Sequence, residues 1–127
     1  MPDCLAWGYN SAAMTIHVHP LTDDIWAVKP EGRINMPTAR AMEEALNGLF
    51  DEGRTRVVVD FTVAAYITSL GLKTLLVAQR RARALGGDLQ LAGLGPRMME
   101  IFEMAGFEQV FTIHASAAEA VEGLKPK

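Results

Sequence analysis

Two adjacent hydroxyl residues, Thr68 and Ser69, stand where an apolar stretch gives way to an amphipathic one. Residues 57–61 (Val-Val-Val-Asp-Phe) predict a buried strand, and residues 69–85 predict a helix. Ser69 is therefore expected at a helix N-terminus, where free backbone N–H groups and the positive end of the helix dipole gather. A phosphate on Ser69 would be stabilised there and would add about two negative charges to the surface. The simpler alternative is that Ser69 only caps the helix.

The residues around Ser69 do not predict hydrolytic chemistry. A nucleophilic serine needs a base within hydrogen-bond reach, but His17, His19 and His114 fall on other predicted strands. Ser69 also lacks the Gly-x-Ser-x-Gly pattern of a nucleophile elbow. Asp60 has no second carboxylate beside it in the local sequence, so its expected role is to brace the loop that leads to Ser69. We therefore expect a switch or binding protein and not an enzyme.

Three other polar patterns are weaker candidates for sites. His17 and His19 lie on one face of a predicted strand, but no third metal ligand accompanies them, and the alternation places them on the polar face. Residues 93–95 (Gly-Leu-Gly) are only a fragment of a phosphate-loop pattern. The cations of the 69–85 helix are expected to form a solvated face: Lys73, Arg80, Arg81 and Arg83. We expect no metal and no cofactor.

Composition indicates one globular domain. The chain has 127 residues, half of them hydrophobic, which is enough to bury a core. Its net charge of −3 argues against general affinity for nucleic acid. The single cysteine, Cys4, excludes an intrachain disulfide. No apolar run approaches the ~18 residues of a membrane span, and residues 1–13 resemble no signal peptide. These features predict a cytoplasmic protein without membrane insertion.

Periodicity places regular structure from Met14 onward, so residues 1–13 are expected to be an N-terminal extension and residues 14–127 the domain. A first pair of strands has a short link that favours antiparallel pairing. After it, helices alternate with strands, which predicts an α/β fold with a mixed, mostly parallel sheet of about five strands and about four helices, mainly on one face. The expected strands are 14–18, 25–28, 57–61, 89–92 and 110–113; the expected helices are 37–50, 69–85, 96–105 and one after Ser116.

Sites in such sheets gather beyond the carboxyl ends of the parallel strands. Residues 32–37, 62–69 and 93–97 are expected to be loops at that edge. Asn35 or Thr38 is expected to cap the helix that begins near Pro37.

Most of the domain resembles the STAS domain of bacterial anti-sigma factor antagonists. The resemblance runs in order through Gly-Arg-Ile-Asn at 32–35, Val-Val-Val-Asp-Phe-Thr at 57–62 and Tyr-Ile-Thr-Ser-Leu-Gly-Leu at 66–72. It continues through Ala-Leu-Gly-Gly-Asp-Leu at 84–89 and Ala-Gly-Phe at 105–107. The segment 66–72 is similar to the family's phosphorylation loop and is the most specific part of the match.

The resemblance implies a partner-switching function. In the family, an anti-sigma factor that is also a serine kinase of the histidine-kinase-like ATPase type phosphorylates a serine in this loop. The unphosphorylated antagonist sequesters that kinase, and a phosphatase resets the switch. The matching serine is Ser69, and the hydroxyl of Thr68 could either cap the helix or be a second phosphate acceptor. ATP and magnesium would belong to the kinase. The residues implied to bind the partner are Asn35, Thr68, Ser69, Leu70, Gly71 and Lys73, with Asp60 as structural support.

Three residues depart from the family pattern. Asn35 stands where many members have Asp, Thr68 where Asp or Ser is common, and Leu70 where a small residue is usual. These departures favour an alternative function, because STAS domains also serve as non-switching scaffold subunits of transport systems or stress-signalling assemblies. Ser69 itself favours the switch.

Deleting residues 2–13 is expected to change the free energy of unfolding by less than about 0.5 kcal/mol, because the segment lacks an amphipathic pattern that could dock on a core. Thermal and urea denaturation of the two forms would measure the difference. A loss of several kcal/mol would show that the segment packs on the domain or builds an interface.

Overall fold

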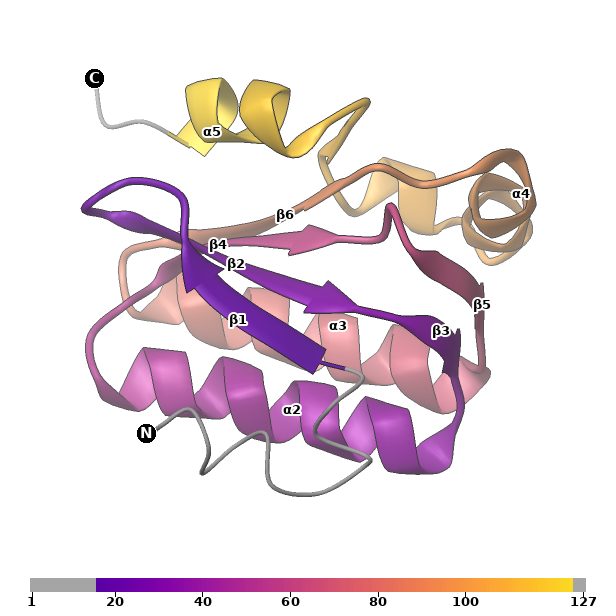
Figure 1. Cartoon of the computed structure of the whole chain (residues 1–127), viewed down its shortest axis with the longest axis horizontal. Coiled ribbons are helices and arrows are strands. Elements are labelled where there is room, and N and C mark those ends of the chain that lie inside the picture. Colours follow the sequence, from indigo (N-terminus) through magenta and orange to yellow (C-terminus); the bar gives the residue numbers. More distant parts are fainter. Residues whose placement is uncertain (1–15, 125–127) are drawn as a thin grey trace.

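The computed structural model describes residues 16–124, so the expected extension of residues 1–13 lies outside the described part. Strands and helices alternate along most of the chain, as Figure 1 shows. The strands are β1 (Ile16–Pro20), β2 (Ile25–Pro30), β3 (Gly32–Ile34), β4 (Arg56–Asp60), β5 (Ala64–Ile67), β6 (Asp88–Ala92) and β7 (Ile113–His114). The helices are α2 (Met36–Asp51), α3 (Ser69–Ala84), α4 (Pro96–Met104) and α5 (Ala117–Leu124), with a short 3-10 turn, η2 (Phe107–Gln109).

The main sheet has five strands in the order β1-β2-β4-β6-β7. β1 and β2 form an antiparallel hairpin, and all the other neighbours are parallel. The predicted fold class, a mixed and mostly parallel sheet with four helices, is therefore confirmed. The hairpin follows from the four-residue link between β1 and β2, because a parallel connection needs a much longer crossover.

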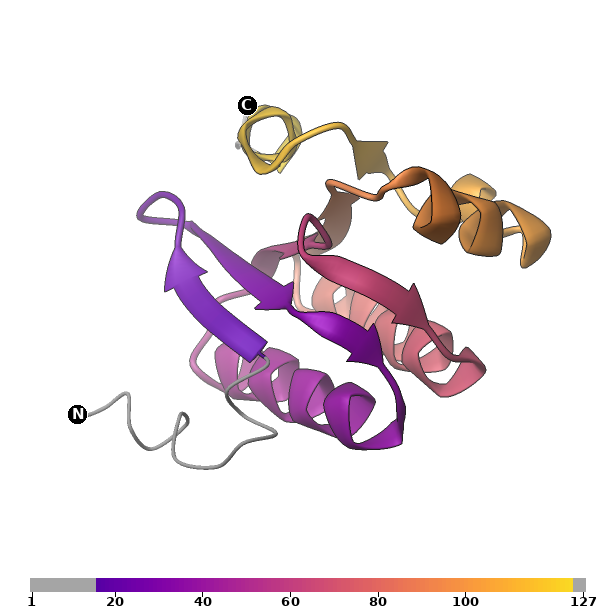
Figure 2. The ribbon, with the colours of Figure 1, turned by 45° about the vertical axis from the view of Figure 1, so that its right-hand side comes forward.

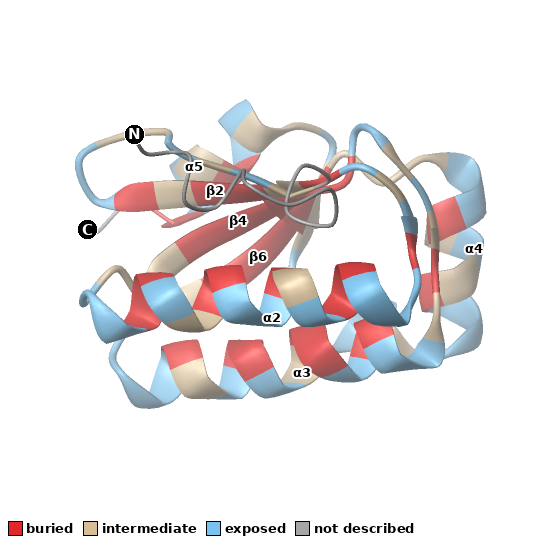
Figure 3. Ribbon diagram, turned by 60° about the horizontal axis from the view of Figure 1, so that its bottom comes forward, coloured by how far each residue is buried: buried red, intermediate tan, exposed pale blue. Residues whose placement is uncertain are grey.

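The two long helices, α2 and α3, cover one face of the sheet, and the short helix α5 covers the other (Figure 1). The sequence of β4 explains why helices pack on both faces of the sheet. Val57 and Val59 are buried in the core under α2 and α3, whereas Val58 is buried in a smaller core under α5. A central strand that is apolar at consecutive positions is buried on both faces. Figure 3 shows the buried side of α2 and α3 turned to the sheet and the exposed side turned to solvent.

Two of the three segments expected to be loops contain strands instead. β3 and β5 pair in parallel as a separate two-stranded sheet beside the main one (Figure 2). Sequence reasoning missed them because each is short and its partner is distant in the chain. The expected strand 110–113 is also wrong in its bounds, since η2 occupies residues 107–109 and only Ile113 and His114 pair with β6.

The first turn of α3 packs very closely on the β3–β5 pair. A Cβ atom on Gly71 would lie 2.6 Å from Cγ1 of Ile67 and 3.1 Å from Cγ2 of Ile34, two side chains that are themselves buried. Only a residue without a side chain allows the helix to approach this far. Gly71 therefore sets the distance between the start of α3 and the strands before it.

Gly71→Ala is expected to lower the free energy of unfolding by about 1–3 kcal/mol, because overpacking a close contact outweighs the helix-forming advantage of alanine. Gly48→Ala is the matched control: Gly48 is helical in α2, and a Cβ atom on it would have no atom within 4 Å. That variant is expected to gain about 0.5–1 kcal/mol. Urea denaturation measures both, and a stabilised Gly71→Ala would contradict the packing argument.

Candidate functional site

Thr68 caps α3. Its backbone is extended, with φ −87° and ψ 170°, and its Oγ1 accepts a hydrogen bond from Gly71 N at 3.3 Å. Its own N–H donates to Ile34 O at 3.1 Å, which ties the cap to β3. The expectation that Thr68 could cap the helix is therefore confirmed, and the alternative expectation that Ser69 caps it is wrong. The reason is the strand before it: β5 runs through Ile67, so Thr68 is the last extended residue and Ser69 the first helical one.

Ser69 is the first residue of α3, as predicted, and its side chain is exposed. Within residues 16–124 its hydroxyl has no hydrogen-bond partner. The backbone N–H groups of Ser69 and Leu70 also find no acceptor in that part of the chain. The Ser69 hydroxyl, which makes no hydrogen bond in residues 16–124, thus lies beside the two free N–H donors of Ser69 and Leu70. Both are at the positive end of the 16-residue helix α3.

Asn35 caps α2 in the same way. Its Oδ1 accepts hydrogen bonds from Thr38 N at 3.2 Å and from Thr38 Oγ1 at 3.0 Å. Ile34 and Ile67 are direct partners in the parallel β3–β5 pair, and each is followed immediately by a helix cap. The register therefore places the N-termini of α2 and α3 side by side, although Asn35 and Thr68 are far apart in the sequence.

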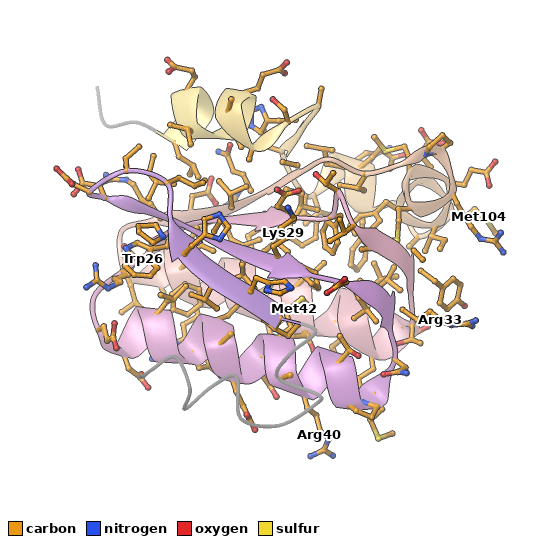
Figure 4. All side chains as sticks on the ribbon, in the orientation of Figure 1. Trp26, Lys29, Arg33, Arg40, Met42 and Met104 are labelled. Atoms are coloured by element: carbon orange, nitrogen blue, oxygen red, sulfur yellow. The ribbon has the colours of Figure 1, made fainter. Side chains whose placement is uncertain are left out.

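A shallow groove of about 240 Å³ runs between α2 and α3 from this end. α3 contributes Leu70, Lys73, Thr74 and Val77 to its walls, and α2 contributes Arg40 and Glu43. Figure 4 shows Arg40 projecting away from the sheet, whereas Met42 on the same helix points toward it. The structure thus places two of the predicted binding residues, Leu70 and Lys73, in a groove beside Ser69.

Sequence reasoning missed three surface residues of this region: Met36, Arg40 and Val77. Met36, at the start of α2, is 57% exposed and Val77 is 52% exposed, which is unusual for large apolar side chains. Their position on the polar faces of amphipathic helices was the available signal. Only the packing of α2 against α3 shows that Arg40 and Val77 share a groove.

Two of the predicted site residues are buried. Gly71 is covered, and it contributes to packing instead of to the surface. Asp60 is 9% exposed; its Oδ1 accepts from Thr62 N at 2.9 Å and also from the Thr62 hydroxyl. Gly93, with φ +74°, passes so close that a Cβ there would lie 2.9 Å from the same carboxylate oxygen. Asp60 therefore holds the turn between β4 and β5, behind the exposed surface.

The histidines lie away from Ser69. His17 is exposed on β1 and contacts Glu31 at 3.2 Å, and His114 Nε2 lies 2.7 Å from Gln90 Oε1 beside α5. In residues 16–124 no three His, Cys, Asp or Glu side chains gather as metal ligands would. Among the described helices, none has the length and apolarity needed to cross a membrane.

The fold and this site define a STAS domain. The family model described as "Mlab, STAS domain" matches residues 21–114. The chain therefore belongs to the STAS-domain family, and the expected resemblance to anti-sigma factor antagonists is confirmed.

One relative and two solved structures illustrate the likeness. BtrV of Bordetella bronchiseptica, provisionally named an anti-sigma factor antagonist, is 34% identical over 95 residues, which cover 75% of this chain and 82% of BtrV. The phosphorylated form of SpoIIAA from Bacillus matches with a TM-score of 0.69 at 17% identity, over 87% of this chain and 99% of SpoIIAA. A Thermotoga maritima protein, TM1081, matches with a TM-score of 0.80 at 14% identity, over 92% and 100%. At these identities the two structures establish the fold.

Thr68→Val is expected to lower the free energy of unfolding by about 1 kcal/mol, because it removes the oxygen that accepts from Gly71 N. Thr68→Ser keeps that oxygen and is expected to stay close to the wild type. Urea denaturation measures the stability, and hydrogen exchange at the Gly71 amide reports on the cap directly. Equal protection of that amide in both variants would contradict the assignment of Thr68 as the cap.

Proposed function

We propose that the protein is an anti-sigma factor antagonist that works as a phosphorylation-controlled binding switch. With Ser69 unphosphorylated, it sequesters a cognate anti-sigma factor that is also a serine kinase of the histidine-kinase-like ATPase type. Phosphorylation of Ser69 releases that kinase, and a phosphatase restores the binding form. The observation that carries the proposal is the exposed Ser69 hydroxyl, which has no partner in residues 16–124 and stands at the start of α3 beside a groove.

The local structure supports a phosphate on Ser69 without loss of the fold. Thr68, and not Ser69, makes the cap, so modification of Ser69 removes no hydrogen bond of the described chain. The free N–H groups of Ser69 and Leu70 and the dipole of α3 favour an added negative charge. The phosphate would change the surface and leave the β3–β5 pair and the core as they are.

The same phosphate opposes binding. A partner that closes over the α2–α3 end covers Ser69, and a charge that loses its water without gaining a counter-charge weakens a complex by a few kcal/mol. ATP and magnesium belong to the kinase in this scheme, and the chain itself needs no cofactor and performs no catalysis. The scheme involves no nucleic acid and no insertion into a membrane, and it places the protein in the cytoplasm with its kinase.

One observation favours a second function, a non-switching scaffold subunit of a transport system or of a stress-signalling assembly. Leu70 and Val77 are large apolar residues exposed in the walls of the groove, at 37% and 52%, and Met36 at the start of α2 is 57% exposed. Apolar patches of this kind suit a permanent contact as well as a regulated one.

Affinity for the kinase distinguishes the two functions. The kinase is first recovered from the native host by pull-down with the tagged full-length protein, then purified. Phosphorylated Ser69 is expected to bind about a hundredfold more weakly than the unmodified protein, Ser69→Asp is expected to show part of this loss, and Ser69→Ala is expected to bind constitutively. Calorimetry measures the affinities, and labelled ATP follows phosphate transfer.

Thr68→Val and Thr68→Ser are the controls for the second acceptor. Thr68→Val removes the hydroxyl at position 68, Thr68→Ser keeps one, and both keep Ser69. The switch is contradicted if wild type and Ser69→Asp bind equally and no kinase labels Ser69 or Thr68. A transport or stress-signalling protein recovered equally by both forms would establish the scaffold function instead.

A further inference from the structure

The four cations of α3 fall into two groups. Arg81 pairs with Asp51 at 2.7 Å, and Arg83 pairs with Asp88 at 2.9 Å. Lys73 and Arg80 have no carboxylate within 4.0 Å in residues 16–124. The paired cations lie in the last turn of the helix, and Lys73 lies one turn from Ser69. The basic residues of α3, expected to form a solvated face, therefore divide into two that are paired with carboxylates, Arg81 and Arg83, and two that are not, Lys73 and Arg80.

The groove brings Lys73 close to a second uncompensated cation. Arg40 lines the α2 side, and it too has no ion pair in the described chain. Glu43 is the only carboxylate among the described lining residues, so two cations against one carboxylate leave the lining at +1, in a protein of net charge −3. Leu70 and Val77 add exposed apolar surface to the same walls.

We propose that this groove docks an acidic segment of the partner kinase and that Lys73 is shared between that segment and a phosphate on Ser69. In the bound form, carboxylates of the segment meet Lys73 and Arg40, and an apolar side chain of the segment covers Leu70 and Val77. The inference rests on the proposed function, and it adds the chemistry of the partner and the residue on which binding and phosphorylation compete.

The geometry of α3 gives Lys73 this double role. Residues four apart on a helix face each other, with about 5–6 Å between their Cβ atoms, so a phosphate on Ser69 lies within reach of the Lys73 ammonium group. Lys73 also lines the groove, which Ser69 does not. A phosphate therefore draws Lys73 out of the groove and places negative charge beside the docked carboxylates. Arg80 lies about 16 Å further along the helix axis than Ser69, outside the groove.

The contact between Lys73 and the phosphate can be tested on the protein alone. The full chain is made with phosphoserine incorporated at position 69, and the phosphorus resonance is titrated by NMR at low salt. A nearby cation favours the dianion, so Lys73→Met is expected to raise the second pKa of the phosphate by about half a pH unit. Arg80→Met removes the same charge from the same helix and is expected to change it little. Equal titration of the two variants would overturn the contact.

Docking is tested by calorimetry with the purified kinase recovered by the wild-type protein. Lys73→Glu and Arg40→Glu are each expected to weaken binding by about tenfold or more, whereas Arg80→Glu, with the same change of charge outside the groove, is expected to stay within about twofold. Circular dichroism melts check that all three variants fold. Three equal effects would show general electrostatic attraction and would overturn the groove as the docking site.

Because the docked segment and the phosphate share Lys73, the effects of Lys73→Met and of Ser69 phosphorylation on kinase affinity are expected to be non-additive. In a Lys73→Met background, phosphorylation of Ser69 is expected to weaken binding less than it does in the wild type, and additive losses would overturn the competition. Failure of this inference is distinguishable from failure of the switch. If phosphorylation releases the kinase while Lys73→Glu and Arg40→Glu behave like Arg80→Glu, only the inference fails. If the wild type binds no kinase, the switch and the docking claim both fail, and the phosphorus titration still decides whether Lys73 holds the phosphate.

Discussion

The parallel pairing of Ile34 with Ile67 keeps the N-termini of the two long helices, α2 and α3, side by side. Each isoleucine is the last residue of a short strand, and each is followed at once by a polar cap, Asn35 or Thr68. Because the strands are parallel and in register at this point, the two caps must lie beside each other, and so must the helix N-termini that they begin. Gly71 then brings the first turn of α3 down onto both isoleucines. The groove and the exposed serine are consequences of this one contact between segments that are distant in the sequence.

Stability and binding chemistry are carried by different groups at the Ser69 end. Thr68 satisfies the helix terminus and the β3 backbone, and Asp60 secures the preceding turn from a buried position. The Ser69 side chain makes no hydrogen bond in the described chain, so its hydroxyl is free for modification. A residue that both capped the helix and carried the phosphate would change the atoms that cap the helix each time it was modified. The separation of the two roles lets a surface charge change while the domain stays the same.

Helix α3 also separates residues that stabilise the fold from residues that are available for binding. Near its C-terminus, Arg81 bonds to Asn47 and Asp51 at 2.7 Å each and lies over the ring of Phe50, so it clamps α3 to α2. Cations in the last turn also favour the helix dipole. Near the N-terminus, Lys73 lies in the second turn and has no counter-charge in residues 16–124. A cation held in that position is the part of the helix whose charge remains available to an anion from outside, or to one attached to Ser69.

The sequence by itself determined the domain class, the hairpin, the four helices to within about one residue at most ends, and the place of Ser69 at a helix start. Those features follow from local periodicity, glycine stops and helix caps, which a single segment displays without its neighbours. The sequence did not reveal β3 and β5, because strands of three and four residues become recognisable only when they pair. It also placed the last strand too early, since Val110 and Phe111 have strand-like side chains but follow a 3-10 turn. Tertiary structure alone decided between Thr68 and Ser69 as the helix cap, and it alone decided that Gly71 is buried and that Arg40 and Val77 meet across a groove. Each of these depends on how distant segments pack and not on the residues' own propensities.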